Sequence, residues 1–440
     1  MDSSTRQHIG RRTVLRWAGL AAGAAGAAAA LPWPGETGPL PSATLAAAAT
    51  GPDPDLLFKA GRFAAADREY ARLLRKHAAD ATALAGRGRI ALLSNRFAAA
   101  EKYLTQALRL APDDVSATRE LAQCFVRQDR LSRAVPLLRA TGDPDDAAFA
   151  AQYAAVTGNP YAMRGAQRTR LPFVCVDPLP CVRAVVNGGE PQNFLIDTGA
   201  TLAFATETAE RAGLRAVSTS VSTPAGQTLE TRHGVMPSFR LGGIELRDVP
   251  VVWYDLRMPV LPDGSRPAGV IGTTLLYHFL ATMDYANQEL VLRRRTAAQQ
   301  RELQATVRRT GTGRLPLWLA GDHIPCTLGS VNGHGPRVAS LDTGGMGLGV
   351  MMNEENARRA GVTIDYANPR DGGGMKMYPI KPATARIGDT VRRDVPGVVG
   401  AWPWLELFGF DTIANFSHEF FRPCAITFDY TGMDFYITGP

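Results

Sequence analysis

One short stretch occurs twice in this chain, and it constrains the fold more than any other feature. Residues 194–200 read F-L-I-D-T-G-A, and residues 338–345 read V-A-S-L-D-T-G-G. In each copy an apolar, strand-forming run leads directly into Asp-Thr-Gly. A Val-Asn-Gly turn precedes both copies, and an Ala-x-Arg-Ala-Gly segment follows both. The pattern indicates a duplicated β module that presents one carboxylate in each half of the chain.

The repeated acids, Asp197 and Asp342, are candidates for a catalytic pair that shares one proton. A carboxylate on a loop between buried strands is partly desolvated, and two carboxylates that meet there cannot both ionise. The charged partner can act as general base on a bound water, while the protonated partner donates to a carbonyl oxygen. This arrangement predicts hydrolysis of a peptide bond without a covalent intermediate.

The residues next to the two acids suit loops that meet face to face. We expect Thr198 and Thr343 to hydrogen-bond across the pair of loops. Gly199 and Gly344 permit a tight turn and let backbone N–H groups approach the carboxylates.

Each copy is also followed by an apolar-apolar-Gly sequence, which ends at Gly272 in the first half and at Gly409 in the second. We expect the strands that carry Gly272 and Gly409 to pass behind the two Asp loops and to support them. Asp284 and Asp429 each precede a tyrosine at a turn between strands, and we interpret them as turn residues.

From about Arg170 to Pro440 the chain resembles the retropepsin-like aspartic proteases, and its tandem lobes are similar to the pepsin architecture. The resemblance places the catalytic roles on Asp197 and Asp342. Residues 197–200 match the family motif D-T-G-A, whereas the second copy has Gly345 at the fourth position. The resemblance also implies a β-hairpin flap over the cleft. Residues 222–228, around Gly226, are the first candidate, and residues 371–376 are a second.

The part before the β region is helical and repetitive. A Gly/Asn/Asp-Arg-Phe/Leu sequence followed by small residues recurs at 61, 95 and 129, with a period of 34 residues. This period is that of tetratricopeptide repeats, which the segment resembles. The resemblance implies a groove for a peptide or protein partner, and a structural cap for the following domain is an equally open interpretation.

The first residues resemble a twin-arginine export signal. Arg11 and Arg12 precede a soft apolar tract that runs from Trp17 to Leu31. An uncleaved membrane anchor is the alternative, but the tract is shorter than the roughly 20 apolar residues that a span requires. We therefore expect an exported protein that is periplasmic, in the cell envelope or extracellular, with no stable membrane span after signal cleavage.

These patterns predict a multidomain chain. It has a signal and linker at 1–50, all-α tetratricopeptide-like hairpins at 51–160, and a mainly-β, two-lobed aspartic-protease fold with lobes at 165–300 and 310–440. A polar segment at 296–308 is expected to be a helix or tether that joins the lobes. Because the duplicated lobes are covalently joined, pairing within one chain is entropically easier than pairing between chains, so we expect a monomer.

Composition excludes several other functions. The net charge of +7 is spread along the chain by arginine, so nucleic acid is not an expected partner. The seven histidines and five cysteines show no metal-ligand spacing, and no metal or cofactor is expected. Cys175 and Cys181 are near enough in sequence to cross-link, but the pairing is undetermined. Trp402 and Trp404 could line a substrate pocket or pack in a core.

The leading hypothesis is an exported aspartic endopeptidase that acts on a peptide or protein substrate, with helical repeats that bind the substrate or a protein partner. The alternative is a non-catalytic adaptor that keeps the protease fold and binds peptides or proteins. Gly345 is the feature that favours this alternative, because glycine at that position removes a side chain from the second Asp loop.

Overall fold

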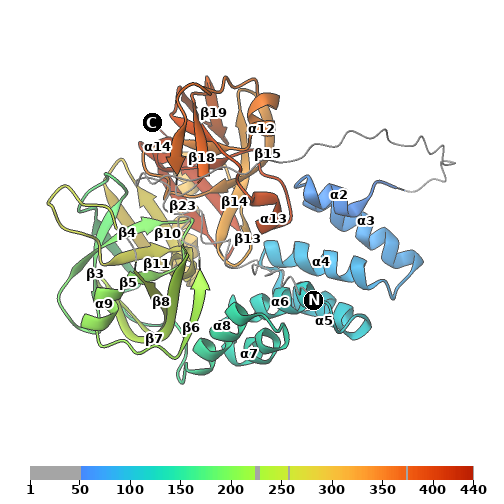
Figure 1. Ribbon diagram of the computed structural model, residues 1–440, viewed down its shortest axis with the longest axis horizontal. Coiled ribbons are helices and arrows are strands. Elements are labelled where there is room, and N and C mark those ends of the chain that lie inside the picture. The colour runs from blue at the N-terminus through green and yellow to red at the C-terminus, as the bar shows by residue number, and fades with distance from the viewer. Residues whose placement is uncertain (1–50, 223–227, 256–257, 373–374, 440) are drawn as a thin grey trace, which may run out of the picture.

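The computed structural model describes residues 51–222, 228–255, 258–372 and 375–439. The described chain begins with helices and continues as β-sheets (Figure 1). The candidate flap residue Gly226 lies outside the described residues. Among the described residues, no helix is both long enough and apolar enough to cross a membrane.

The N-terminal region is a series of antiparallel helical hairpins. Asp53, Asp80, Asp114 and Asp143 each cap the N-terminus of a helix by accepting a hydrogen bond from a backbone N–H, which satisfies donors that the helix itself cannot. Three fully buried alanines, at 66, 100 and 134, let neighbouring helices approach closely. The helices are α2 (Pro54–Lys59), α3 (Phe63–Lys76), α4 (Ala81–Leu93), α5 (Phe97–Leu110), α6 (Val115–Val126), α7 (Leu131–Ala140) and α8 (Pro144–Ala154).

Lobe 1 is an eight-stranded sheet in the order β1-β8-β5-β9-β4-β3-β7-β6. Side chains alternate between the two faces of β4, so that Phe194 and Ile196 enter the main core while the buried Leu195 packs in a smaller cluster on the other face. The elements are β1 (Ala162–Gly165), β3 (Cys181–Val186), β4 (Gln192–Asp197), β5 (Ala203–Ala205), α9 (Thr206–Arg211), β6 (Ser218–Ser222), β7 (Leu229–Leu241), β8 (Ile244–Tyr254), β9 (Gly269–Gly272) and α10 (Thr273–Leu276).

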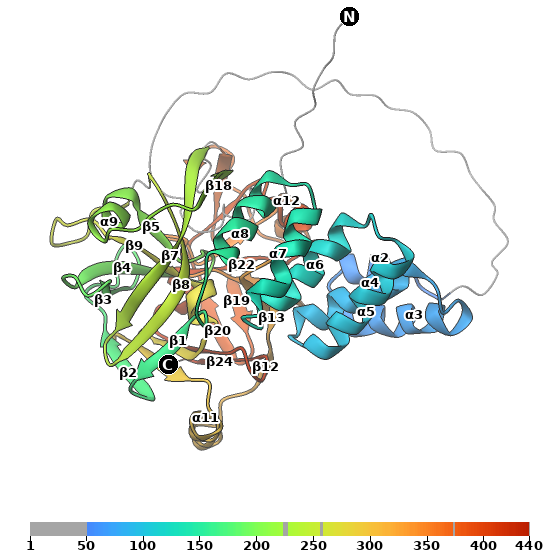
Figure 2. The same ribbon diagram turned by 90° about the horizontal axis from the view of Figure 1, so that it is seen from below.

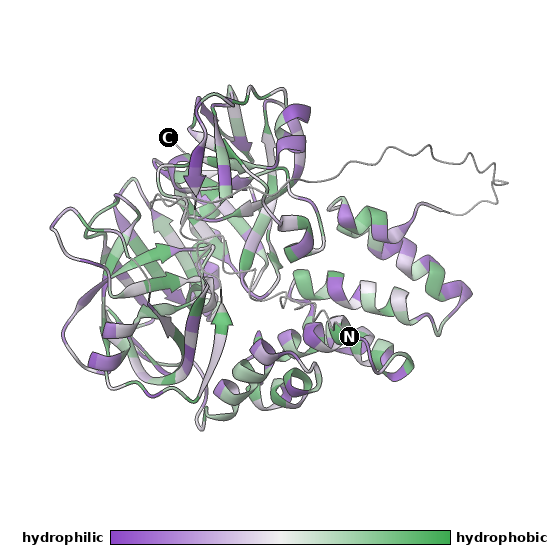
Figure 3. Cartoon of the chain, in the orientation of Figure 1, coloured by the Kyte–Doolittle hydropathy of each residue, from purple (hydrophilic) through white to green (hydrophobic). Residues whose placement is uncertain are grey.

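Lobe 2 is built on a second large sheet, in the order β17-β18-β21-β16-β22-β15-β14-β19-β20, with β13 paired to β14. Its elements are β13 (Trp318–Ala320), β14 (Ile324–Val331), β15 (His334–Leu341), β16 (Val350–Met352), α12 (Glu354–Arg359), β17 (Arg370–Gly372), β18 (Met375–Ile380), β19 (Thr384–Ile387), β20 (Thr390–Arg393), β21 (Gly397–Val399), α13 (Trp404–Phe408), β22 (Asn415–Phe416) and α14 (His418–Phe421). Helix α12 is hydrophilic, as expected for a surface helix (Figure 3).

A six-stranded sheet in the order β12-β24-β23-β10-β11-β2 joins the two lobes. Its centre is the antiparallel pairing of β10 with β23, one strand from each half. The polar segment between the lobes forms helix α11 (Ala297–Thr310), which lies far from the helical repeats (Figure 2). The strands are β2 (Arg168–Pro172), β10 (Phe279–Asp284), β11 (Glu289–Arg294), β12 (Leu315–Pro316), β23 (Ala425–Asp429) and β24 (Asp434–Thr438).

The helical repeats pack against both lobes (Figures 1 and 2). Phe58 and Phe63 share an apolar cluster with Trp402, Trp404 and Phe410 of lobe 2. At the other end of the array, α8 contacts β6 and β7 of lobe 1. Trp402 and Trp404 are therefore core residues in this structure, and the repeats are an integral part of the folded body.

Candidate active site

The two Asp-Thr-Gly loops meet at the boundary between the lobes. Asp197 ends β4 and Asp342 directly follows β15. The loops cross so closely that a Cβ atom on Gly199 would lie 2.3 Å from Asp342 Cγ, and one on Gly344 would lie 2.2 Å from Asp197 Oδ2. Only glycine fits at these positions, because each carboxyl group occupies the space beside the opposite loop.

The two carboxyl groups are buried, and they share a hydrogen bond. Each also accepts a hydrogen bond within its own loop, from the Gly199 N–H at 2.7 Å and from the Gly344 N–H at 2.9 Å. Both donors bind Oδ1 of the acid in their own loop and so fix the orientation of each carboxyl group.

The threonines of the two motifs lock the loops together. Thr198 Oγ1 accepts a hydrogen bond from the Thr343 N–H at 3.0 Å, and Thr343 Oγ1 accepts one from the Thr198 N–H at 3.0 Å. Thr198 Oγ1 also donates to the Leu341 carbonyl at 2.9 Å. Each of these three bonds crosses from one half of the chain to the other, so they hold the two lobes in register next to Asp197 and Asp342.

The electrostatic environment of the two acids differs. Burial and the nearby carboxylate of Asp342 raise the pKa of Asp197 well above its ordinary value. Burial also raises the pKa of Asp342, but hydrogen bonds from Asp197, Gly344 and Asn415 and the charge of His323 oppose this. We therefore assign the shared proton to Asp197 and the negative charge to Asp342.

Asn415 contributes to this asymmetry. Its Nδ2 donates to Asp342 Oδ2 at 3.1 Å, and its Oδ1 accepts from Ser340 Oγ at 2.8 Å. The corresponding pair of positions in lobe 1 holds Leu195 and Val270. One acid therefore has an amide donor beside it, and the other faces hydrocarbon.

Comparison with known protein families agrees with this geometry. The family model described as aspartyl protease matches residues 182–275. The family model described as tetratricopeptide repeat matches residues 55–114 and 94–147. The chain contains an aspartyl protease domain and tetratricopeptide repeats. No curated protein matches the chain.

In the protease domain, a parallel strand supports each Asp loop. In lobe 1 this strand is β9, with Gly272 opposite Asp197. In lobe 2 it is β22, which pairs with β15 through Asn415 and Phe416. The prediction that Gly409 supports the second loop is therefore wrong. Gly409 ends helix α13 with a φ of 75°, and its nearest neighbour is the Phe58 ring.

Ser417 takes the place in lobe 2 that Gly272 has in lobe 1. Its Oγ accepts a hydrogen bond from the Gly345 N–H at 2.9 Å and donates to the Asp342 carbonyl at 2.5 Å. A Cβ on Gly345 would lie 2.3 Å from this Oγ. A Cβ on Gly272 would in turn lie 2.0 Å from the Ala200 carbonyl oxygen.

The two lobes therefore use different residues where the Asp loop approaches its supporting segment. Lobe 1 has a side chain in the loop, at Ala200, and none on the supporting strand, at Gly272. Lobe 2 has none in the loop, at Gly345, and a hydroxyl beyond the strand, at Ser417. The departure from D-T-G-A at Gly345 is thus compensated by a residue that sequence reasoning missed.

An apolar surface adjoins the acids on the side of lobe 1. Leu195 shares a face of β4 with Asp197, because side chains alternate along a strand. It packs in a cluster with Leu179, Cys181, Met258, Leu261 and Val270, and Met346 of the second loop packs against this cluster. Hydrocarbon from both lobes thus shields the pair from bulk water, which strengthens their electrostatic interaction.

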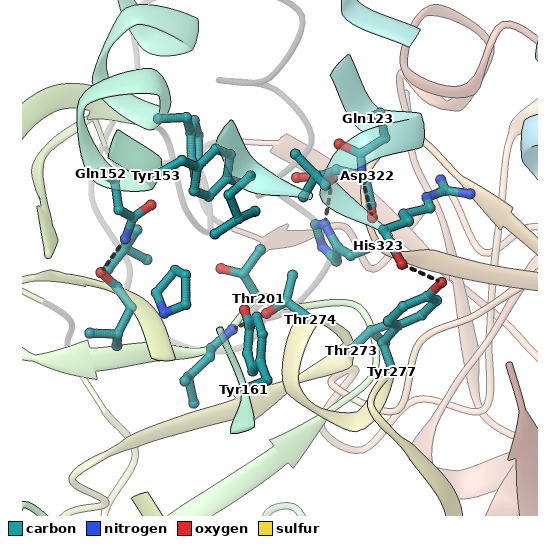
Figure 4. A pocket seen from close by; sticks show the side chains of 18 of the residues that line it. Gln123, Gln152, Tyr153, Tyr161, Thr201, Thr273, Thr274, Tyr277, Asp322 and His323 are labelled. Atoms are coloured by element: carbon teal, nitrogen blue, oxygen red, sulfur yellow. Dashed lines mark hydrogen bonds and ion pairs between the residues drawn. The ribbon is translucent and has the colours of Figure 1, made fainter. Parts of the chain in front are cut away.

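A cavity of about 80 Å³ lies between the repeats and lobe 1, next to the first Asp loop (Figure 4). Gln152 and Tyr153 line it from the repeats, and Thr201 and Thr274 line it from lobe 1. His323 of lobe 2 also reaches this cavity. Thr201 lies four residues after Asp197, so the repeats line a cavity next to the loop that carries Asp197.

Among the described residues, Asp177, His418 and Glu419 lie near enough to one another to hold a metal ion. However, Arg422 donates to both oxygens of Asp177, at 2.9 Å and 2.6 Å. The positive charge that these acids require is already supplied by the guanidinium. We interpret this cluster as an ion pair that links the two lobes.

Proposed function

We propose that this protein is an aspartic endopeptidase of the retropepsin-like type, with a single active site formed within one chain. The observation that carries the proposal is the hydrogen-bonded pair of buried carboxyl groups, one from each half, held in register by crossed threonines. The expected substrate is an extended segment of a peptide or protein.

In the proposed reaction, a water molecule binds between the two acids. Asp342, the ionised partner, takes a proton from this water as its oxygen attacks the carbonyl carbon of the substrate. Asp197 gives its proton to the carbonyl oxygen, which produces a tetrahedral diol. Asp342 then passes its proton to the leaving nitrogen as the C–N bond breaks, and Asp197 recovers a proton from a hydroxyl group of the diol.

The test is cleavage of an unstructured protein, such as casein, by the purified mature chain. We expect cleavage that a statine-type inhibitor blocks and that Asp197→Asn or Asp342→Asn abolishes. Asp284→Asn is the matched control, because within the described part of the chain the carboxylate of this acid accepts hydrogen bonds only from Asn287 of the same surface turn. Cleavage that persists in both site variants would disprove the proposal, and folded protein that binds casein without cutting it would favour the adaptor.

We also propose that the protein is exported through the twin-arginine route and acts as a monomer outside the cytoplasm. The support is the Arg11-Arg12 pair before the apolar tract of residues 17–31. Replacement of both arginines by lysine is expected to leave the precursor in the cytoplasm, as measured by cell fractionation. Unchanged export of that variant would exclude this route.

A further inference from the structure

We propose that His323 is a positioning residue for the catalytic pair and that the tetratricopeptide repeats hold it in place. The proposal rests on the proposed peptidase function. His323 lies in the loop between β13 and β14 of lobe 2, residues 321–323. This loop lies between the repeats and the first Asp loop (Figure 4).

Both ring nitrogens of His323 contact hydrogen-bond acceptors. Nε2 lies 3.0 Å from the carbonyl oxygen of Gly199, and Nδ1 lies 2.5 Å from Oδ1 of Asp322. A carbonyl and a carboxylate can only accept, so the ring makes both hydrogen bonds when each nitrogen carries a proton. In that form His323, which is only 1% exposed, carries a positive charge beside Asp322.

This charge is placed to act on the catalytic pair. The positive charge of His323 lowers the pKa of Asp342, against the effect of burial. The other charged groups near the ring are the carboxylates of Asp322 and Asp342 and the guanidinium of Arg127. The arrangement keeps Asp342 ionised, as the general base must be.

His323 also anchors the first Asp loop from outside its own lobe. The Gly199 carbonyl belongs to the Asp-Thr-Gly motif of lobe 1, whereas the histidine comes from lobe 2. In the second loop, Ser417 anchors Gly345 from within the same lobe. The first loop therefore depends on a contact across the boundary between the lobes.

The repeats fix the backbone that carries His323. Arg127 donates to the carbonyls of Leu319 at 3.0 Å and Gly321 at 2.7 Å, and to Leu92 of α4 at 2.8 Å. Gln123 donates to the Asp322 carbonyl at 3.2 Å. Arg127 is buried, and burial lowers its pKa to about 10. Such a buried cation depends on these carbonyls, so the contact is specific.

The loop of residues 321–323 therefore contacts the face of the repeats that α4 and α6 turn toward lobe 2. The chain itself occupies this face, and the catalytic pair is linked to the repeats through Arg127 and His323. On this basis the repeats are part of the catalytic apparatus, in addition to any partner that they bind elsewhere.

The first experiment compares His323→Leu and His323→Gln with wild type in the casein assay. Leucine removes both the hydrogen bond and the charge, and glutamine restores a donor without the charge. We expect kcat to fall about tenfold for leucine, which corresponds to the loss of one charge-assisted bond, and less for glutamine, with KM within twofold. For both variants the acid limb of the kcat profile should move to higher pH, because Asp342 loses a nearby positive charge.

His278→Gln is the matched control. His278 is also largely buried, but among the described residues its hydrogen-bond partner is Asp129 of the repeats, at 3.1 Å, and not a residue of the Asp loops. It should keep the wild-type kcat and pH profile. Wild-type kinetics in both His323 variants, or higher activity in either, would overturn the proposal.

A second measurement separates this proposal from the peptidase proposal. Hydrogen exchange of the amides at 194–202 does not require activity, and it should rise in His323→Leu. Gln123→Leu, a milder change than removal of Arg127, should raise exchange in the same segment by loosening the histidine loop. If wild type does not cut casein, the peptidase proposal fails, and unchanged exchange in both variants would overturn the positioning role independently.

Discussion

The contact between Gly345 and Ser417 offers a stringent test of how the second Asp loop is built. In Gly345→Ala, the new methyl group would lie 2.3 Å from Ser417 Oγ and 3.0 Å from Ser417 Cβ. Overpacking of this kind costs about 1–3 kcal/mol. The displaced hydroxyl would also lose hydrogen bonds with the Gly345 N–H and the Asp342 carbonyl, each contributing about 1 kcal/mol. We expect a total loss of about 3–5 kcal/mol in unfolding free energy.

Ser417→Gly removes the same hydrogen bonds without a clash, and its cost should be about 1–3 kcal/mol. The double variant reproduces the Ala200 and Gly272 combination of lobe 1. It should therefore be no less stable than Ser417→Gly alone, so the favourable coupling should equal the whole cost of Gly345→Ala, about 3–5 kcal/mol.

The assay is thermal and urea unfolding followed by circular dichroism, with casein cleavage measured in parallel. Gly313→Ala is the control, because a Cβ there would lie 3.7 Å from its nearest neighbour. Gly313→Ala should unfold at the same temperature and urea concentration as the wild type. If Gly345→Ala were within 0.5 kcal/mol of wild type, or if the two single losses simply added, the compensation between these residues would be refuted.

Other predictions concern the acids and their neighbours. Activity should be lost below about pH 6, because burial raises the pKa of Asp342 to about 6 and only its ionised form is a base. Activity should also be lost as the pH rises through the raised pKa of Asp197, because the proton donor is then ionised. A pH profile that lacks either limb would contradict the assignment of the two acids. Asn415→Val should raise the pKa of Asp342 further and move the acid limb upward, which a pH series of kcat would detect; an unchanged limb would exclude the amide as the source of the asymmetry. Gly199→Ala should abolish cleavage, because its Cβ would lie 2.3 Å from Asp342 Cγ; measurable cleavage by this variant would show that the loops can separate.

The sequence was most informative where the chemistry is local. Asp197 and Asp342 lie in motifs that repeat visibly, and the 34-residue period of the helices depends on small residues at fixed places. His323 and Asn415 were missed because their roles depend on segments that are distant in the chain. No local pattern marks a histidine that reaches a loop 124 residues away.

The error at Gly409 has a different cause. The apolar-apolar-Gly sequence at 407–409 lies at the C-terminal end of helix α13, whereas the supporting strand of lobe 2 ends at Phe416, one residue before Ser417. Spacing would have found the right residue. Gly272 precedes Asp284 by 12 residues, and Ser417 precedes Asp429 by the same number. The duplicated register was a better guide than the residue type, because a hydroxyl replaces glycine in the second half.

The six-stranded sheet between the lobes has a consequence for proteolytic nicking. Strands β10 and β11 come from the first half, and β23 and β24 from the second, so each half contributes hydrogen bonds along the full length of β10 and β23. A cut within the exposed helix α11 would break the chain but none of these ladders. The nicked protein should therefore give two fragments on a denaturing gel. Under native conditions the two fragments should stay associated, with Asp197 and Asp342 still paired.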